Sequence, residues 1–122
     1  GDFYLFGKKA KDVGPYPNKW LILGGGVNLG KETIEEGLRR EICEEGNIEI
    51  KNIKKIDFGE DFKEKKGVMT HFIFLDFLAE YDSGKEKPGD DIAEIKWVHK
   101  EEIKNLDLCE PSIMLLKKLN LV

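Results

Sequence analysis

The stretch that decides the fold is GVNLGKETIEEGLRREICEEGNI, residues 26–48. Its centre predicts one helix over Thr33–Glu45. The hydroxyl of Thr33 can cap the first turn, and the two glutamates that follow lie near the positive end of the helix. Apolar residues recur every four positions, a spacing that indicates a core-facing stripe, at Ile34, Leu38 and Ile42.

Three glutamates lie together on the predicted helix. At about 100° per residue, Glu41, Glu44 and Glu45 fall within an arc of about 100° beside the apolar stripe. Like charges at these spacings weaken a helix by a few tenths of a kcal/mol per pair, so their concentration suggests a bound cation. Carboxylate oxygens favour Mg²⁺ or Mn²⁺ over zinc. The alternative is a solvated acidic face, the usual meaning of a run of charges.

Gly37 lies on the same arc, one turn before Glu41. Glycine inside a helix costs about 1 kcal/mol relative to alanine. We therefore expect a close-packed neighbour or a ligand beside Gly37.

The order of residue types around the helix adds a second signal. A glycine, an isolated glutamate, an Arg-Glu pair, a bulky residue, a Glu pair and a closing aliphatic residue follow at rigid spacing: Gly26, Glu32, Arg40-Glu41, Ile42, Glu44-Glu45 and Ile48. This pattern resembles the Nudix box, the signature of hydrolases that cut nucleoside diphosphates linked to another group. One position departs, because the family has glycine where Asn47 stands. Asparagine tolerates a left-handed helix cap nearly as well as glycine, so we interpret the exchange as mild.

The resemblance implies a fold and a chemistry. The fold is α/β, a Nudix-type α/β/α sandwich around a mixed β-sheet, and the reaction is metal-assisted attack of water on phosphorus. Matched by position, Glu41, Glu44 and Glu45 would hold one or more divalent ions, Mg²⁺ or Mn²⁺. Arg40 would orient these acids by a charge-assisted pair, with Glu32 as a candidate partner.

The general base stays open at this point. In the family it is either a glutamate of the box or an acid on a later loop. Asp90, Asp91 and Glu94 lie where that later acid would come from. For each of them alone, a solvated carboxylate is the commoner reading.

A short strand at Trp20–Leu23 and three glycines precede the box. Glycines leave backbone N–H groups free to approach a phosphate, so Gly25 and Gly26 are candidate substrate-binding residues. Aromatic side chains can stack on a nucleobase, which makes Trp20 and Phe72 candidates as well. Aromatic residues on strands are more often core, and the same alternative holds for Phe74 and Trp97.

The remaining chain predicts a loop at Lys8–Asn18 and alternating strands. We expect strands at Ile48–Phe58, Val68–Tyr81 and Glu94–Val98, a turn at Gly59–Gly67, a loop at Asp82–Asp91, and helices at Lys100–Leu106 and Glu110–Leu119. Val68–Tyr81 carries apolar residues on both faces, which predicts a central strand covered on both sides. On the last helix, we expect Ile113, Leu116 and Leu119 to supply the buried face. The segment Ile92–Ile103, with Trp-Val before a Glu pair, also resembles the family.

The box of the family normally follows two strands joined by a tight turn. Gly1-Asp2 looks like that turn and Phe3–Phe6 like the second strand, so we expect the first strand to precede residue 1. The edge of Phe3–Phe6 would then be under-paired, which invites association and leaves a homodimer open.

Length and composition limit the alternatives. The 122 residues suit a single domain over residues 1–122, and the net charge of −4 with no basic stripe argues against general nucleic-acid binding. No apolar run reaches membrane-spanning length, and no signal peptide is visible. Cys43 and Cys109 are too few for a disulfide framework, which favours a cytoplasmic location.

Three functions compete. The first is hydrolysis of a nucleoside triphosphate or of a nucleoside diphosphate linked to another group, with a small-molecule nucleotide as the partner. The second is a catalytically silent Nudix-fold domain that binds a nucleotide or regulates. The intact set Glu41, Glu44 and Glu45 favours the enzyme, because a binding module has no need for three mutually repelling carboxylates. The third, isoprenoid-diphosphate isomerisation, lacks a convincing cysteine and metal-histidine set.

Overall fold

The structure is a computed structural model that describes residues 1–14 and 16–122. Its elements in chain order are β1 (Phe3–Lys9), β2 (Trp20–Leu21), α1 (Ile34–Gly46), β3 (Glu49–Lys65), β4 (Val68–Ser83), β5 (Ile92–His99), the 3-10 helix η1 (Lys100–Asn105) and α2 (Glu110–Lys118). The chain divides into two compact units, residues 1–49 with 82–122 and residues 50–81. The single domain expected over residues 1–122 stays a prediction. Part of the expected loop at Lys8–Asn18, namely Pro15, lies outside the described residues.

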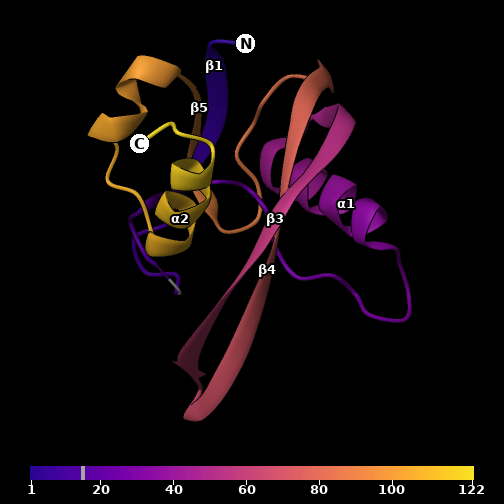
Figure 1. Ribbon diagram of the computed structural model, residues 1–122, viewed down its shortest axis with the longest axis vertical. Helices are drawn as coiled ribbons and strands as arrows, with labels where there is room; N and C mark the ends of the chain where they lie inside the picture. Colours follow the sequence, from indigo (N-terminus) through magenta and orange to yellow (C-terminus); the bar gives the residue numbers. More distant parts are fainter. Residues whose placement is uncertain (15) are drawn as a thin grey trace. The chain divides into compact units, whose positions relative to one another are not determined.

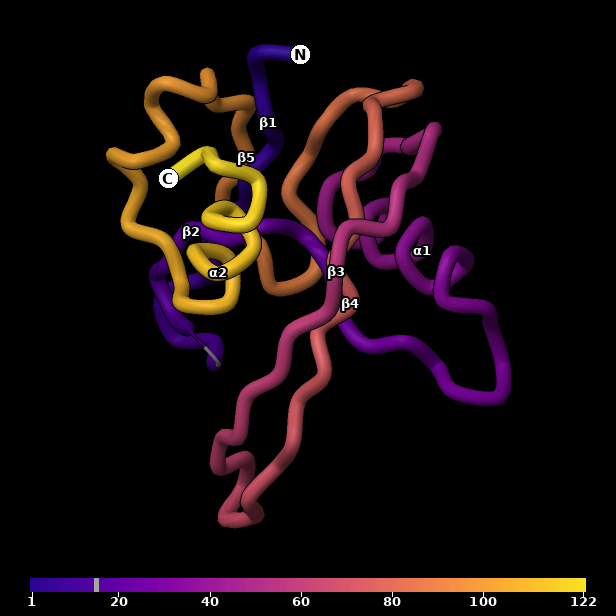
Figure 2. The backbone as a smooth tube through the Cα atoms, in the orientation of Figure 1, coloured from indigo at the N-terminus to yellow at the C-terminus, as the bar shows by residue number. Residues whose placement is uncertain are grey.

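The first unit contains a three-stranded sheet in the order β2-β1-β5; Figure 1 labels β1 and β5, and Figure 2 labels all three strands. β1 runs antiparallel to β5, from the pair Phe3↔His99 to the pair Lys9↔Ile92. On its other side β1 pairs with β2 only at Gly7 and Lys8. An isolated parallel bridge joins Trp20 to Leu108, so the pairing is mixed.

Residues 3–6 pair with β5 but take no part in the pairing of β1 with β2. One edge of this segment is therefore under-paired within the part of the chain that the structure describes. A preceding strand stays a prediction, as does the homodimer.

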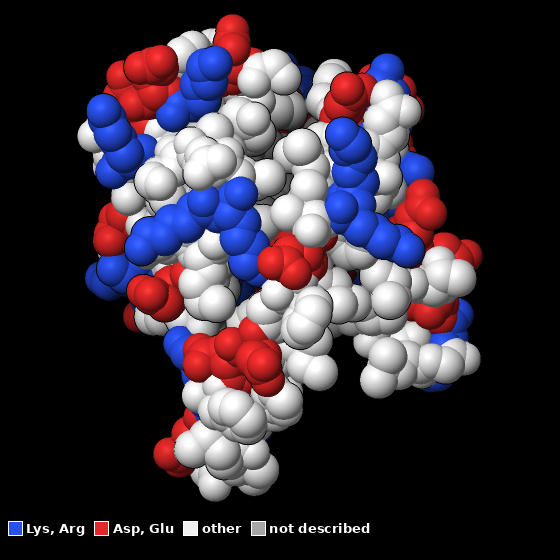
Figure 3. All heavy atoms as spheres, in the orientation of Figure 1, with Lys and Arg blue, Asp and Glu red and all other residues white. Residues whose placement is uncertain are grey.

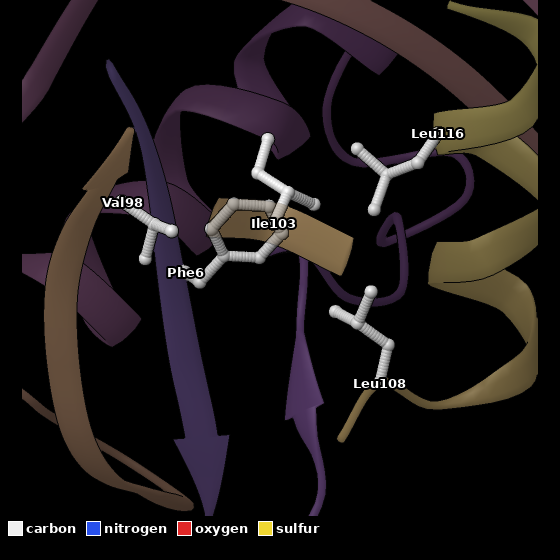
Figure 4. Packing of buried hydrophobic residues seen from close by; sticks show 5 residues of the cluster. All are labelled: Phe6, Val98, Ile103, Leu108 and Leu116. Carbon is white, nitrogen blue, oxygen red and sulfur yellow. The ribbon is translucent and has the colours of Figure 1, made fainter. Parts of the chain in front are cut away.

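One face of this sheet is covered by η1 and α2. Its core consists of five buried residues that point toward one another: Phe6, Val98, Ile103, Leu108 and Leu116 (Figure 4). The side chains of Phe6 and Ile103 are 1% and 0% exposed. Because alternate strand residues point to opposite faces, Phe6 lies on this side and its neighbours Leu5 and Gly7 lie on the other.

The opposite face is covered by α1. A second cluster of Leu21, Leu23, Ile92 and Cys109 packs there, with Ile42 of α1 against it. A Cβ on Gly46 would come within 3.0 Å of the Leu23 side chain, so α1 lies close against the sheet. Helices therefore cover both faces, which confirms the expected α/β/α arrangement.

The helix α1 begins and ends as expected. The hydroxyl of Thr33 accepts the N–H of Glu36, and the Glu36 carboxylate accepts the N–H of Thr33, which makes a complete capping box. Asn47 ends the helix in the left-handed conformation with φ 59°, and its N–H donates to the carbonyl of Cys43. The exchange of glycine for asparagine is therefore accommodated, as predicted.

The apolar stripe of α1 was expected to face the core, and this is wrong for its first member. Ile34 is 46% exposed, while Leu38 and Ile42 are half-buried. The most buried residues of α1 are Gly37, Glu45 and Gly46. The side of α1 that carries the acids faces the glycine loop, residues 24–26, to which Glu45 bonds. Helical periodicity locates a stripe but does not measure how deeply each residue lies.

The later elements of the first unit follow the prediction with small changes. β5 is longer than the expected Glu94–Val98, and the expected helix at Lys100–Leu106 is of the 3-10 type. α2 has Pro111 in its first turn and buries Ser112, Leu115 and Leu116. Leu116 is thus confirmed as buried, whereas Ile113 and Leu119 are half-buried and Leu115 was not expected. Among the described helices, none has both the length and the apolar character needed to cross a membrane.

The second unit is an antiparallel ribbon of β3 and β4 that corrects two expectations. Gly59–Gly67 is not a turn: β3 continues to Lys65, and Lys66 and Gly67, with φ of 53° and 79°, form the two-residue reversal. Positive φ at both central residues suits a tight hairpin. The charged residues that suggested a turn lie instead along an exposed strand.

β4 was also expected to be a central strand covered on both sides, and this is wrong. β3 and β4 form a two-stranded sheet, and apolar side chains of the ribbon are 45–67% exposed: Phe58, Phe62, Val68, Met69, Ile73, Leu75 and Tyr81. The ring of Phe62 stacks on His71 at 4.3 Å between centroids. An apolar pattern on both faces does not decide whether neighbouring strands are present.

Candidate active site

Arg40 is the hub of the candidate site. Its Nε donates to both carboxylate oxygens of Glu32 at 3.0 and 3.1 Å, and its Nη2 donates to the first of them at 2.8 Å. Its Nη1 donates to Glu41 at 2.8 Å and to both oxygens of Glu44 at 3.2 Å. Nη2 also donates to the carbonyl of Gly26 at 2.8 Å. One planar fork therefore connects the glycine loop with three of the predicted acids.

Charge pairing explains the protonation states of this hub. The hydrogen bonds from Arg40 and from the amide of Asn28 hold the pKa of Glu32 below its ordinary value. The hydrogen bonds that Arg40 donates to carboxylates, to Glu32 first and to Glu41 next, raise the pKa of Arg40. Glu32 therefore stays a carboxylate and Arg40 stays a cation across the physiological pH range, so this charged pair persists.

Glu45 bonds to the glycine loop through its own carboxylate. Its side chain is buried, and its Oε1 accepts a 2.8 Å hydrogen bond from the amide of Gly24. Burial raises the pKa of Glu45 to about 7, and the charges of Glu41 and Asp90 act in the same direction, whereas the Gly24 bond and Lys9 oppose it. A carboxyl in this range can take up or release a proton near neutral pH.

Gly25 in the glycine loop has a steric reason to lack a side chain. A Cβ on Gly25 would overlap the carboxylate of Glu41, whereas a Cβ on Gly26 would meet no atom within 4 Å. On α1, a Cβ on Gly37 would lie 3.4 Å from both Glu32 and Val27. The close neighbour expected beside Gly37 is therefore present.

The donor set suits a hard divalent ion in its chemistry, because every candidate ligand is a carboxylate oxygen. The charge of Glu41 acts on the buried Glu45 and raises its pKa, a repulsion that a cation would relieve. Within the described residues, however, no three His, Cys, Asp or Glu side chains converge on one point. Arg40 instead holds Glu41 and Glu44, and Glu45 bonds to Gly24.

The three acids expected to lie after the box, Asp90, Asp91 and Glu94, fall into two groups; Glu94 lies on β5. Asp91 pairs with Lys9 at 3.4 Å and Glu94 pairs with Lys8 at 3.7 Å. Asp90 is instead close enough to Glu45 for its charge to raise the pKa of that carboxyl. Of the three, Asp90 is the acid that acts on the box.

The two aromatic candidates, Trp20 and Phe72, belong to different units of the chain. Trp20 packs against the core between the sheet and α2, and Lys96 lies over its ring at 4.5 Å. Its neighbour Leu21 packs in the cluster on the α1 side of the sheet. Phe72 lies on β4 in the second unit, where its ring stacks on Phe74 at 6.3 Å between centroids. Their role in substrate binding stays a prediction.

Sequence reasoning missed two contributors to this region, the amide of Gly24 and the side chain of Lys9. It also did not predict that the segment before β5 bonds to the end of α1. The run of three glycines was a signal for the Gly24 amide. The segment itself was predicted as a loop and as the source of a later acid, through Asp90 and Asp91.

The NUDIX domain profile matches residues 4–118. The chain belongs to the NUDIX domain family. Among curated relatives, a nucleoside triphosphatase NudI of Enterobacter sp. (strain 638) is 38% identical over 117 residues, covering 88% of this chain and 80% of the relative. The NudI of Escherichia coli (strain K12) is 34% identical over 112 residues, covering 86% and 79%. The chain is thus a Nudix hydrolase, as the box implied.

Solved structures agree on the Nudix fold. A MutT NUDIX hydrolase from Burkholderia pseudomallei superposes with a TM-score of 0.81 at 20% identity, over 94% of this chain and 86% of that one. The NUDIX domain of Shewanella oneidensis NrtR, complexed with ADP ribose, gives 0.76 at 13% identity, over 95% and 74%. At these identities the likeness establishes the fold alone.

Charged side chains of both signs are interspersed on the face drawn in Figure 3. This mixture of both signs accords with the net charge of −4.

Proposed function

We propose that this Nudix hydrolase cleaves a phosphoanhydride bond of a nucleoside triphosphate, or of a nucleoside diphosphate linked to another group, by attack of water on phosphorus. The names of the two NudI relatives support the triphosphate. The partner is a small-molecule nucleotide, and the location is cytoplasmic, in keeping with two free cysteines.

The observation that carries this proposal is the set of hydrogen bonds that the guanidinium group of Arg40 donates. It gathers Glu32, Glu41 and Glu44, and it also holds the carbonyl of Gly26 on the loop. A surface patch of solvated charges has no need for one cation bound to three carboxylates and a backbone oxygen. The arrangement fits a preorganised acidic site facing the glycine loop.

Glu41, Glu44 and Glu45 are the residues that would hold Mg²⁺ or Mn²⁺. When bound, such an ion polarises the phosphoryl oxygens, activates water and neutralises the leaving phosphate. Arg40 would keep Glu41 and Glu44 oriented, while Glu32 holds the guanidinium in place. The glycines at 24–26 would let the phosphates approach the main chain closely, and the Gly24 amide already fixes Glu45.

Two groups on this chain are candidates to take the proton from water. In the metal-free protein, burial raises the pKa of Glu45 to about 7, so a proton can be held there near neutral pH, and a cation bound nearby would favour the carboxylate that accepts one. Asp90 lies on the segment just before β5 and acts on Glu45 through its charge. Asp91 and Glu94 are less suited, because each is paired with a lysine.

The test is incubation of the purified protein with Mg²⁺ and a panel of nucleoside triphosphates and diphosphate-linked nucleotides. Release of phosphate or pyrophosphate together with the nucleotide product supports the proposal. A protein that binds members of the panel in a thermal-shift assay but releases no product with either Mg²⁺ or Mn²⁺ would be the silent binding domain instead.

A further inference from the structure

Asn47, the residue that departs from the family's box, does more than end α1. Its backbone lies in the left-handed region, with φ 59° and ψ 31°, and its N–H donates to the carbonyl of Cys43 at 2.9 Å. A glycine would serve both purposes. Its side chain adds a third contact, because Nδ2 donates to the carbonyl of Lys85 at 3.1 Å.

That contact reaches a segment that lies against the carboxyl end of the helix. Figure 2 traces the chain through residues 85–91, between the end of β4 and the start of β5. The amide of Lys87 donates to the carbonyl of Gly46 at 3.0 Å, and the amide of Gly89 donates to the carbonyl of Glu45 at 3.1 Å. These are carbonyls at the end of the helix, which have no partner within it.

The approach of this segment is close as well as bonded. A Cβ on Gly89 would overlap the carbonyl of Glu44, and a Cβ on Gly84 would come within 2.8 Å of the carbonyl of Asn47. The far end of the segment is held too, since the amide of Ala10 donates to the carbonyl of Asp91 at 3.1 Å. The segment is therefore attached to the end of α1 on one side and to Ala10, the residue that follows β1, on the other.

We propose that Asn47 is a positioning residue whose side chain fastens residues 85–91 to the end of α1 and so places Asp90 beside the box. Three contacts, from Asn47, Lys87 and Gly89, attach the segment to the last turn of the helix that carries Glu44 and Glu45. Asp90 follows Gly89 directly. A glycine at position 47 would keep the helix cap but lose the side-chain contact with Lys85. The asparagine that replaces the family's glycine therefore supplies a contact that glycine could not make. The catalytic consequence rests on the proposed function.

The variant Asn47→Gly tests this, because it keeps the left-handed cap and removes only the side-chain donor. The matched control is Asn120→Gly, at a residue with φ 57° that follows the other helix and whose N–H donates to the carbonyl of Lys117. The first measurement is hydrogen exchange of individual amides by NMR, on the full chain without substrate. In Asn47→Gly we expect the amides of Lys87 and Gly89 to exchange about three- to tenfold faster, because the loss of one hydrogen bond makes local opening of the segment easier by that factor. In Asn120→Gly we expect them to be unchanged.

The second measurement is steady-state hydrolysis, with kcat and KM determined separately. Asn47→Gly should lower kcat by about tenfold, because a loosened segment misplaces Asp90. KM should change less, and the melting temperature should match that of Asn120→Gly. Unchanged exchange at Lys87 and Gly89 would overturn the proposal, and faster exchange with an unchanged kcat would overturn the positioning role. An inactive wild-type protein would count against the proposed function instead, since the exchange measurement needs no turnover.

Discussion

Oε1 of the buried Glu45 accepts a 2.8 Å hydrogen bond from the amide of Gly24. This bond attaches the acid that ends the box to the glycine loop that precedes it. It satisfies only part of what a carboxylate requires, because burial still raises the pKa of Glu45 to about 7. The stability of the protein should therefore depend on pH in a way that reports this one residue.

The free energy of unfolding of the metal-free protein should fall as the pH rises from about 4.5 to about 7. Glu45 has a folded pKa above its ordinary value of 4.5, so the folded state favours its protonated form. The stabilisation is complete below 4.5 and is lost as the pH rises through about 7, with an upper bound of about 3 kcal/mol. Urea unfolding across this range is the measurement.

The variant Glu45→Gln is the control for this pH dependence. Its amide oxygen can still accept the Gly24 bond, but it carries no titrating charge. Its stability should be flatter between pH 4.5 and 7 than that of the wild type. Glu32 acts in a separate window: its pKa is lowered, so its stabilisation is lost as the pH falls below 4.5. Equal slopes for wild type and Glu45→Gln would refute the buried-acid account.

Gly25→Ala should lower activity by about tenfold or more. A Cβ at this position would overlap the carboxylate of Glu41, which must then leave its place beside Arg40. Small displacements at a reacting centre cost up to about a hundredfold in rate. Gly14→Ala is the matched control, because a Cβ there meets no atom within 4 Å. If both variants kept wild-type kcat/KM, the packing of the loop against Glu41 would have no part in catalysis.

Arg40→Lys should lower kcat although the positive charge is kept. A lysine ammonium cannot reach Glu32, Glu41 and the carbonyl of Gly26 at once, as the planar fork does. We expect a loss on the order of a hundredfold, with the helix content by circular dichroism unchanged. Arg39→Lys on the same helix, whose partner Glu35 is exposed, provides the comparison. Similar losses in both variants would contradict the role of Arg40 as the hub.

Local sequence rules predicted the helix α1 well. Thr33 and Glu36 form a capping box between neighbours four residues apart or closer, and Asn47 belongs to the few residue types that accept the left-handed cap. The pairing of Arg40 with Glu32 was also within reach, because residue type and family resemblance agreed on it. Such features depend on short sequence separations.

The features that the sequence did not reveal depend on distant residues. The prediction that β4 is a central strand covered on both faces was wrong, because its apolar pattern carries no information about which strands lie beside it. The close approach of Gly89 to the carbonyl of Glu44 brings together residues 45 positions apart, and the only sign of it in the sequence is the glycine itself. The pKa of Glu45 depends on burial, which helical periodicity locates on a face but does not measure.

Removal of divalent ions should abolish hydrolysis, and Mg²⁺ or Mn²⁺ should restore it. The cations should also raise the melting temperature, because they bind the folded arrangement and relieve repulsion between carboxylates. At a cation concentration of about a hundred times Kd, binding adds about 2.7 kcal/mol to the free energy of unfolding. Activity assays and thermal unfolding with and without chelator give both readouts. Full activity in excess chelator would be incompatible with the proposed chemistry.

The central claim is that the acids of α1 perform chemistry and are not merely a charged helix face. The direct test compares kcat/KM of Glu44→Gln and Glu45→Gln with that of Glu36→Gln, which lies on the same helix outside the acidic arc. Glu36 accepts the Thr33 amide at 2.8 Å, and a glutamine oxygen can do the same, so this control should keep its fold and its rate. The account predicts that Glu44→Gln and Glu45→Gln each lose about a hundredfold or more in kcat/KM while remaining folded. Turnover by both at the rate of Glu36→Gln would contradict it.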